Sequence, residues 1–263
     1  MPEAAAGALL ELEAVTKSFG KVVVADQLSL AIGAGDIVGI VGPNGAGKTS
    51  LFGLISGDLA PSSGEIRFGG HSVTRLDAAA RCRLGIGRTY QVPRPFGEMT
   101  VFENVLVAVQ QGATLRRQAS YERAAQILGQ TGLAPEANIP AERLGLLQRK
   151  RLEVARALAT GPQLILLDEV AGGLTDPEVA ELVRIVRGIR AEGVAVLWIE
   201  HVMRALTAAV DRLICLAGGS FVADGDPAAV LADPAVREVF LGTGVTTSLT
   251  GPSGAAGPAR EDS

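Results

Sequence analysis

Residues 42–49 have the sequence Gly-Pro-Asn-Gly-Ala-Gly-Lys-Thr, which combines glycines with a lysine and a hydroxyl at the spacing of the P-loop motif. In that motif, backbone N–H groups wrap phosphate oxygens at the start of a helix, and the glycines let the backbone approach closely. Lys48 is expected to place positive charge on the β- and γ-phosphates of ATP, and Thr49 to offer its hydroxyl to Mg²⁺. The other nucleotide contacts are expected from the loop and the start of the helix, at Gly42, Pro43, Asn44, Gly45, Ala46, Gly47 and Ser50.

Two adjacent acids, Asp168 and Glu169, end the apolar run Leu164-Ile-Leu-Leu. Successive side chains of a strand point to opposite faces, so the two carboxylates should point in different directions. Asp168 is suited to hold the Mg²⁺ shell, and Glu169 to act as general base toward the water that attacks the γ-phosphate. A strand that ends in Asp-Glu can also be an ordinary solvated strand end, and the P-loop upstream favours the catalytic interpretation.

The elements that must position these residues follow from the hydrophobic pattern. Apolar or alternating runs predict antiparallel strands at the start of the chain, at Leu9–Val15, Val22–Ala25 and Leu28–Ile32. A continuous apolar strand, Asp36–Val41, leads directly into the glycine-rich loop, and a helix follows from Lys48 to about Ile55. A turn over 61–64 then leads to another strand, Glu65–Phe68.

From about residue 77 to 160 the apolar residues recur three and four apart, which predicts helices, and we place an inserted helical subdomain at about 90–160. A strand over 164–167, a helix over Asp176–Glu192 and a strand over Ala195–Ile199 follow. Such alternation indicates a parallel sheet with crossover helices. A strand pair, Leu213–Leu216 and Phe221–Asp224, precedes short helices over 227–240, and residues 243–263 are predicted to be a disordered tail.

In their order along the chain, these motifs resemble those of ABC-type ATPase subunits over residues 9–242. Three further residues carry the resemblance: Phe19 stands where the family has an aromatic that stacks on adenine, Gln91 at the Q-loop and His201 at the switch histidine. It implies that Gln91 senses the metal and the attacking water, while His201 contacts the γ-phosphate and supports Glu169. The implied fold is an α/β P-loop NTPase with an antiparallel β subdomain and the inserted helical subdomain.

The signature segment departs from the family pattern, because Leu144-Gly-Leu-Leu-Gln148 stands where LSGGQ is usual. In dimers of the family, the signature serine and glycines bind the γ-phosphate held by the opposite subunit. Leu146 and Leu147 cannot replace the close backbone approach of glycine, and Gly145 lacks the serine hydroxyl. We therefore expect a heterodimer with a second ATPase subunit. Val170 and Thr175 depart from the usual D-loop as well.

Within the family, residues 88–108 and 199–242 are most similar to the ATP-binding subunits of branched-chain amino acid importers. That resemblance implies two different ATPase subunits, two permeases and, indirectly, a periplasmic solute-binding protein. Import of urea, amides or aromatic acids, or lipopolysaccharide-type export, stays open. A soluble ABC ATPase that acts on DNA or ribosomes would show a long coiled coil or a second ATPase domain, and a small-molecule P-loop kinase would not need the switch histidine.

The composition excludes some partners. The chain has 263 residues with 24 basic and 28 acidic side chains, so no overall basic surface indicates nucleic-acid binding. The apolar runs are much shorter than the ~20 residues that span a bilayer, and the first residues do not have a secretory signal pattern. We expect a cytoplasmic protein that lies peripherally on the inner face of the membrane through its partners.

Overall fold

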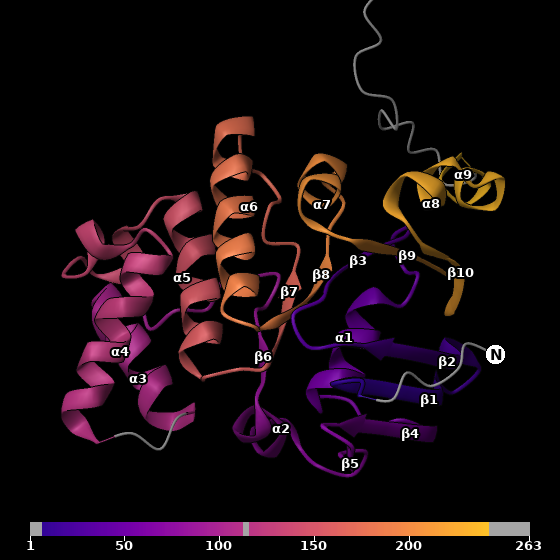
Figure 1. Cartoon of the computed structure of the whole chain (residues 1–263), viewed down its shortest axis with the longest axis horizontal. Helices are drawn as coiled ribbons and strands as arrows, with labels where there is room; N and C mark the ends of the chain where they lie inside the picture. The colour runs from indigo at the N-terminus through magenta and orange to yellow at the C-terminus, as the bar shows by residue number, and fades with distance from the viewer. Residues whose placement is uncertain (1–6, 113–115, 242–263) are drawn as a thin grey trace, which may run out of the picture.

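The computed structural model describes residues 7–112 and 116–241, and its strands form two sheets (Figure 1). The antiparallel sheet has the order β2-β1-β4-β5, with bounds β1 (Leu10–Phe19), β2 (Val22–Ile32), β4 (Ser63–Phe68) and β5 (His71–Ser72). The two runs predicted as Val22–Ala25 and Leu28–Ile32 form one strand, in which Gln27 has a φ of 47°. This irregular residue lets the strand continue through the predicted turn.

The second sheet has six strands in the order β10-β9-β3-β8-β7-β6. Their bounds are β3 (Ile37–Val41), β6 (Ile86–Arg88), β7 (Leu164–Asp168), β8 (Ala195–Ile199), β9 (Arg212–Ala217) and β10 (Ser220–Gly225). All neighbours pair in parallel except β10, which is antiparallel to β9. The predicted parallel sheet is confirmed.

Strand β6 corrects the helical interpretation of the segment that begins at residue 77. It pairs with β7 from Ile86 opposite Leu164 to Arg88 opposite Leu166. Three residues are too few to show a period of two, and the strand forms because β7 supplies its hydrogen-bonding partners. The edge strand of the six-stranded sheet, β6, therefore lies in a region whose sequence pattern is helical.

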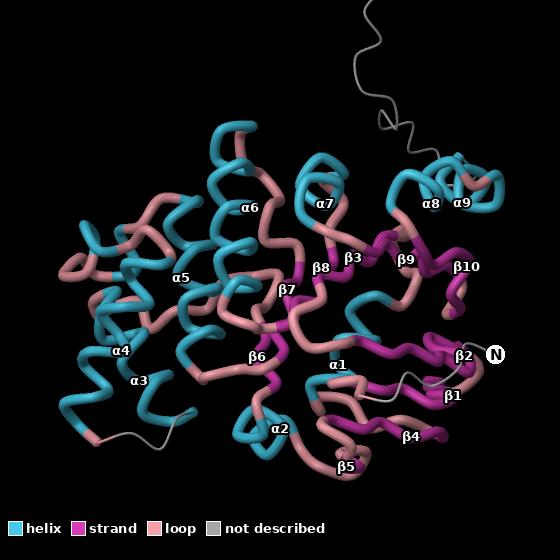
Figure 2. Tube along the Cα trace, in the orientation of Figure 1, coloured by secondary structure: helices cyan, strands magenta, loops and turns pink. Residues whose placement is uncertain are grey.

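Helices surround the sheets in separate groups (Figure 2). The helices α3 (Val101–Gly112), α4 (Arg117–Gln130) and α5 (Leu146–Ala159) lie together at one end of the molecule, in the region predicted to be a helical subdomain. The others are α1 (Lys48–Ser56), α2 (Ala78–Leu84), α6 (Asp176–Ala191), α7 (Met203–Ala209), α8 (Pro227–Ala232) and α9 (Pro234–Leu241). Short 3-10 turns occupy Ala134–Glu136 and Ala141–Arg143. Residues 242–263, which include the predicted tail, lie outside the described residues.

The hydrophobic core has two layers, one on each face of the six-stranded sheet. In β3, Val38 and Ile40 join a cluster with α1 and the antiparallel sheet, while Ile37 and Val41 join a larger cluster with α5, α6 and α7. Strands buried on both faces read as continuous apolar runs, which is why β3, β7 and β8 lack alternation. Because β3, β7 and β8 are parallel, the segments after them meet at one edge of the sheet.

No helix in the described part of the chain is both long and apolar enough to cross a membrane.

Candidate active site

The loop over residues 42–47 connects β3 to α1 and is shaped by two glycines in particular. Gly47 has a φ of 104°, and a Cβ there would lie 2.2 Å from the carbonyl oxygen of Val24 in β2. A Cβ on Gly42 would lie 2.0 Å from the carbonyl oxygen of Leu216 in β9. Any other side chain would push the loop away from both sheets, so the glycines of the P-loop are required here by packing as well as by phosphate access.

Lys48, the first residue of α1, is nearly buried at 9% exposure, and its Nζ donates to the carbonyl oxygens of Gly42, at 2.7 Å, and Pro43, at 2.9 Å. Burial lowers the pKa of the Lys48 ammonium, while the charges of Glu169 and Asp168 act in the opposite direction. The predicted phosphate-binding lysine is thus electrostatically coupled to both predicted acids. Its ammonium donates to neutral carbonyl oxygens, and a phosphate oxygen can take their place as the acceptor.

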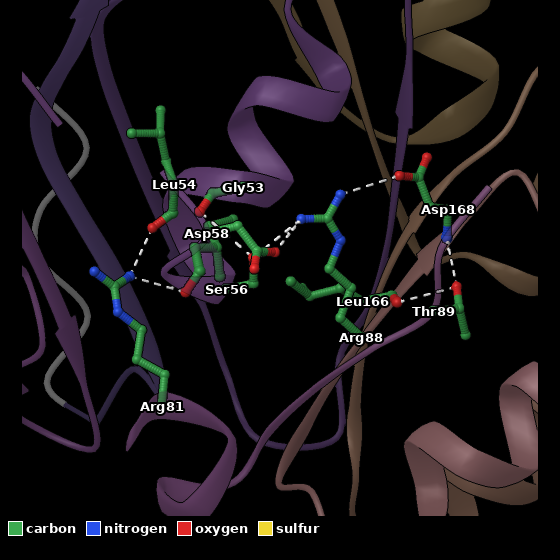
Figure 3. A network of polar contacts seen from close by, with 10 residues as sticks. Gly53, Leu54, Ser56, Asp58, Arg81, Arg88, Thr89, Leu166 and Asp168 are labelled. Atoms are coloured by element: carbon green, nitrogen blue, oxygen red, sulfur yellow. Dashed lines mark hydrogen bonds and ion pairs between the residues drawn. The ribbon is translucent and has the colours of Figure 1, made fainter. Parts of the chain in front are cut away.

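Asp168 ends β7 with 2% exposure, and it is held by Arg88, the last residue of β6, and by Thr89, which follows (Figure 3). Its backbone N–H donates to the Thr89 hydroxyl at 2.9 Å, and Nη2 of Arg88 lies 3.4 Å from its carboxylate. Burial raises the pKa of Asp168, and the positive charge of Arg88 opposes that shift. The carboxylate is therefore fixed in direction before any metal binds.

Arg88 connects this carboxylate to the end of α1. Its Nη1 donates to the Asp58 carboxylate at 2.8 Å and to the Ser56 hydroxyl at 3.0 Å. The guanidinium also lies 5.0 Å from the ring centroid of Tyr90. Figure 3 shows Arg81 on the other side of α1, where it donates to the carbonyl oxygens of Leu54 and Ile55. Two arginines thus anchor the C-terminal end of the helix that the P-loop begins.

Two of the predicted site residues lie against the carboxylate of Glu169. Nε2 of Gln91 donates to its carboxylate at 2.7 Å, and Nδ1 of His201 lies 3.8 Å from the same oxygen. Gln91 comes from the segment after β6 and His201 from the end of β8, so the sheet brings together residues that are 78 and 32 positions away along the chain. The predicted base therefore has one amide and one imidazole directed at it.

The predicted metal ligands fit Mg²⁺ by their chemistry and placement. Thr49, Gln91 and Asp168 offer a hydroxyl, an amide and a carboxylate oxygen, and all three line one cleft of about 690 Å³. Hard oxygen ligands suit Mg²⁺, which is usually held by one or two protein groups plus phosphates. The donor set is therefore adequate without a larger cluster of acids.

Phe19 lies at the end of β1, away from these charges, with 51% of its surface exposed. It pairs across the hairpin with Val22, and Nζ of Lys17 lies 5.0 Å from its ring centroid. The same β2 strand contacts the P-loop through Val24. The exposed ring of Phe19 is available for stacking on a base, as the resemblance implies.

The two leucines of the signature segment behave differently. Leu147 has 9% exposure and packs in the larger core, whereas Leu146, the first residue of α5, is 50% exposed. Gly145 precedes the helix with no side-chain cap. Only Leu146 therefore projects from the start of α5, and Leu147 belongs to the core of its own chain.

Three functional neighbours were not identified from the sequence. Arg88 contacts Asp168, Glu200 binds the segment after Glu169, and Lys150 binds the backbone of Glu169 itself. Each acts on a backbone or carboxylate far away in the chain, so no spacing pattern marks it. A charged residue directly after an apolar strand, such as Glu200 in LWIEHV, is the one available signal.

Comparisons with known proteins show the family of the chain. Residues 25–172 match the ABC transporter family, and residues 222–246 match the family described as "Branched-chain amino acid ATP-binding cassette transporter". The chain is 36% identical to the lipopolysaccharide export system ATP-binding protein LptB of Acidithiobacillus ferridurans, over 89% of this chain and 97% of that protein. It is 34% identical to the high-affinity branched-chain amino acid transport ATP-binding protein BraF of Pseudomonas aeruginosa, over 89% and 98%.

Solved structures of ATP-binding cassettes have the same fold as this chain. A nucleotide-free ATP-binding cassette from an ABC transporter superposes with a TM-score of 0.81 at 30% identity, covering 89% of this chain and 98% of that one. The ADP conformation of MJ1267, an ATP-binding cassette of an ABC transporter, superposes equally well. A P-loop, a strand that ends in Asp-Glu, and a glutamine and histidine at that glutamate thus occur together on a matching fold. The chain belongs to the ABC transporter ATP-binding proteins and is a nucleotide-binding ATPase coupled to transport.

Proposed function

We propose that the chain is the ATP-hydrolysing motor subunit of an importer for branched-chain or related amino acids, with an ABC ATPase domain over residues 9–242. Its partners are a second, different ATPase subunit, two permeases and, indirectly, a periplasmic solute-binding protein. It lies in the cytoplasm on the inner face of the membrane. The observation that carries the ATPase part is the convergence of Gln91 and His201 on the carboxylate of Glu169.

Hydrolysis at this site depends on positioning and on stabilisation of charge. Lys48 binds the β- and γ-phosphates, and Glu169 orients the attacking water and accepts its proton. Gln91 and His201 hold the Glu169 carboxylate, and His201 contacts the γ-phosphate. Thr49, Gln91 and Asp168 would hold Mg²⁺, which neutralises phosphate charge when bound.

Two substitutions test the assigned roles. K48A is expected to abolish nucleotide binding, because it removes the phosphate-binding charge, and E169Q is expected to bind ATP but not turn it over. Fluorescent-nucleotide binding and phosphate release measure the two effects. E98Q neutralises an exposed glutamate of the segment that carries Gln91 and should match the wild type. Normal turnover by E169Q would overturn the assignment of the base.

The amino-acid importer is supported by the matches to BraF and to the branched-chain family over residues 222–246. The 36% identity to LptB favours export as the second candidate. Purification of the intact complex separates them, because an importer copurifies with permeases and a solute-binding protein whose bound amino acids can be identified by mass spectrometry. A complex without any permease would contradict transport altogether.

A coupling helix of the permease is proposed to dock at the part of the cleft of about 690 Å³ that Tyr90, Val92, Glu153 and Arg156 line, while Thr49 and Asp168 are left for Mg²⁺. The walls of this part come from the segment Arg88–Val92 on one side and from Glu153 and Arg156 of α5 on the other. Tyr90 and Val92 are 49% and 64% exposed, so they offer apolar contact area beside Gln91. A helix bound there would touch the residue that holds the Glu169 carboxylate, and so could couple transport to hydrolysis.

The heterodimer is proposed from Gly145 and Leu146, which do not match the phosphate-binding signature. This chain's P-loop would work with an intact signature of the partner. Purified alone, the chain is expected to hydrolyse ATP slowly and without cooperativity. Full-rate, cooperative hydrolysis by the chain alone would contradict the heterodimer and leave the ATPase assignment intact.

A further inference from the structure

We propose that Lys150 is a positioning residue that holds the backbone of Glu169 in the conformation needed for hydrolysis. The proposal rests on the role assigned to Glu169 above. Lys150 lies in the second turn of α5, and its Nζ donates to the backbone carbonyl oxygen of Glu169 at 2.9 Å. Among the described residues it forms no hydrogen bond or ion pair with the phosphate-binding loop or with the Glu169 carboxylate, so it acts through the backbone.

The backbone of Glu169 needs such support. Its φ is 48°, in the left-handed region that non-glycine residues seldom adopt and that costs free energy unless the surroundings enforce it. Its N–H donates to the carbonyl oxygen of Ile199 in β8 at 2.9 Å. Strand β8 therefore holds one side of this residue, and Lys150 holds the other.

The setting of Lys150 indicates that this contact is its main role. The side chain is buried, with 8% exposure, and within residues 7–112 and 116–241 no carboxylate lies within ion-pair distance of it. A buried ammonium is costly unless it is hydrogen-bonded. An apolar side chain of similar length would fill this space without that cost, so the hydrogen bond to Glu169 is what the charge supplies.

A second contact joins α5 to the same segment. Leu146 lies four positions before Lys150, on the same face of the helix. Its Cδ2 is 3.2 Å from the point where a Cβ on Gly173 would be placed. The first two turns of α5 thus contact the segment that follows β7 at residues 169 and 173, and Lys150 makes the contact at the base.

The test compares K150M with R151M, K150R and E169Q in the assembled transporter complex. Arg151 is the matched control, because it is buried on the same helix but forms its ion pair with Glu181 of α6. K150M is expected to lower kcat about 100-fold, the scale of a misplaced catalytic group, with the Kd for ATP unchanged within about twofold. K150R should restore most of the rate, since its guanidinium can donate to the same carbonyl.

R151M should lower the Tm, because it removes the ion pair with Glu181, but keep the wild-type kcat. An equal fall of kcat in R151M and K150M, or no rescue by K150R, would overturn the proposal. If K150M does not fold by circular dichroism, K150Q replaces it, with a kcat expected between those of K150R and E169Q. If E169Q is inactive and K150M has the wild-type rate, only the role of Lys150 is refuted. If E169Q is active, the assignment of Glu169 as the base is refuted.

Discussion

Glu200 shows how a single buried side chain can join two parts of the site. Its carboxylate, at the end of β8 with 1% exposure, accepts from the backbone N–H of Ala171 at 2.5 Å. It also accepts from the N–H groups of His201 and Val202, at 3.3 and 3.4 Å. The segment after Glu169 and the segment that carries His201 are therefore fixed to one carboxylate.

This carboxylate should make stability depend on pH. Burial raises the pKa of Glu200 above its ordinary 4.5, so between 4.5 and the raised value the folded protein binds more protons than the unfolded chain. The free energy of unfolding then falls as the pH rises through that range and levels off above it. E200Q, which cannot ionise, should have a smaller slope, because it loses the contribution of Glu200 and keeps that of Asp168, whose pKa burial also raises. Urea denaturation from pH 4.5 to 8 measures it, and parallel curves for E200Q and wild type would contradict the expectation.

At the same scale, motifs predicted the residues that contact nucleotide in the family. They did not predict the neighbouring residues that fix those side chains in place. The spacing around Lys48 and Asp168 is local, so one segment of sequence is enough to recognise it. Arg88 meets Asp168 across 80 positions and only because β6 joins the sheet. A contact of that kind depends on the tertiary fold, and no periodicity near Arg88 signals it.

Among the elements, α5 illustrates what pattern can and cannot define. Apolar spacing predicted a helix in this region, and the structure gives it the bounds Leu146–Ala159. The pattern treated both leucines of the signature as one departure from the family. Packing separates them, because Leu147 joins the core while Leu146 remains half exposed. The short strands β5 and β6 were missed because they are defined by their partners rather than by their own residues.

Because Leu147 is buried and Leu146 is half exposed, the same substitution should change stability differently at the two positions. L147A removes buried methyl groups and should destabilise the fold by about 2 kcal/mol, at the lower end for a leucine in a core. L146A removes an exposed side chain and should change stability by less than about 0.5 kcal/mol. Guanidinium denaturation midpoints at constant slope measure both. Equal losses would show that the two side chains share one environment.

At the level of the whole molecule, parallel strands bring all the chemistry to one edge of the six-stranded sheet. The P-loop follows β3, Asp168 ends β7 with Glu169 directly after it, and His201 follows β8. The α/β class, the parallel sheet and its crossover helices could be predicted because the alternation of strands and helices is long and regular. The pairing with a second ATPase subunit is a property of two chains, and it is inferred from Gly145 and Leu146 together with the resemblance to branched-chain amino acid importers.

A partly restored signature tests that inference. G145S together with L146G supplies a hydroxyl and a glycine backbone at the start of α5 and leaves the buried Leu147 in place. On the E169Q background with Mg²⁺ and ATP, this variant should form a homodimer by light scattering, whereas E169Q alone should remain a monomer. A stable homodimer of E169Q alone would show that the native segment already suffices.

The left-handed backbone at Glu169 also lowers the thermal stability of the protein, although the Glu169 side chain is needed for hydrolysis. A non-glycine residue in this conformation carries roughly 1–2 kcal/mol of strain, more than the 0.5–1 kcal/mol of extra chain entropy that a glycine would lose on folding. E169G should therefore be slightly more heat-resistant than the enzyme it inactivates. A laboratory selection for thermostability that does not also demand activity is therefore expected to replace this glutamate by glycine.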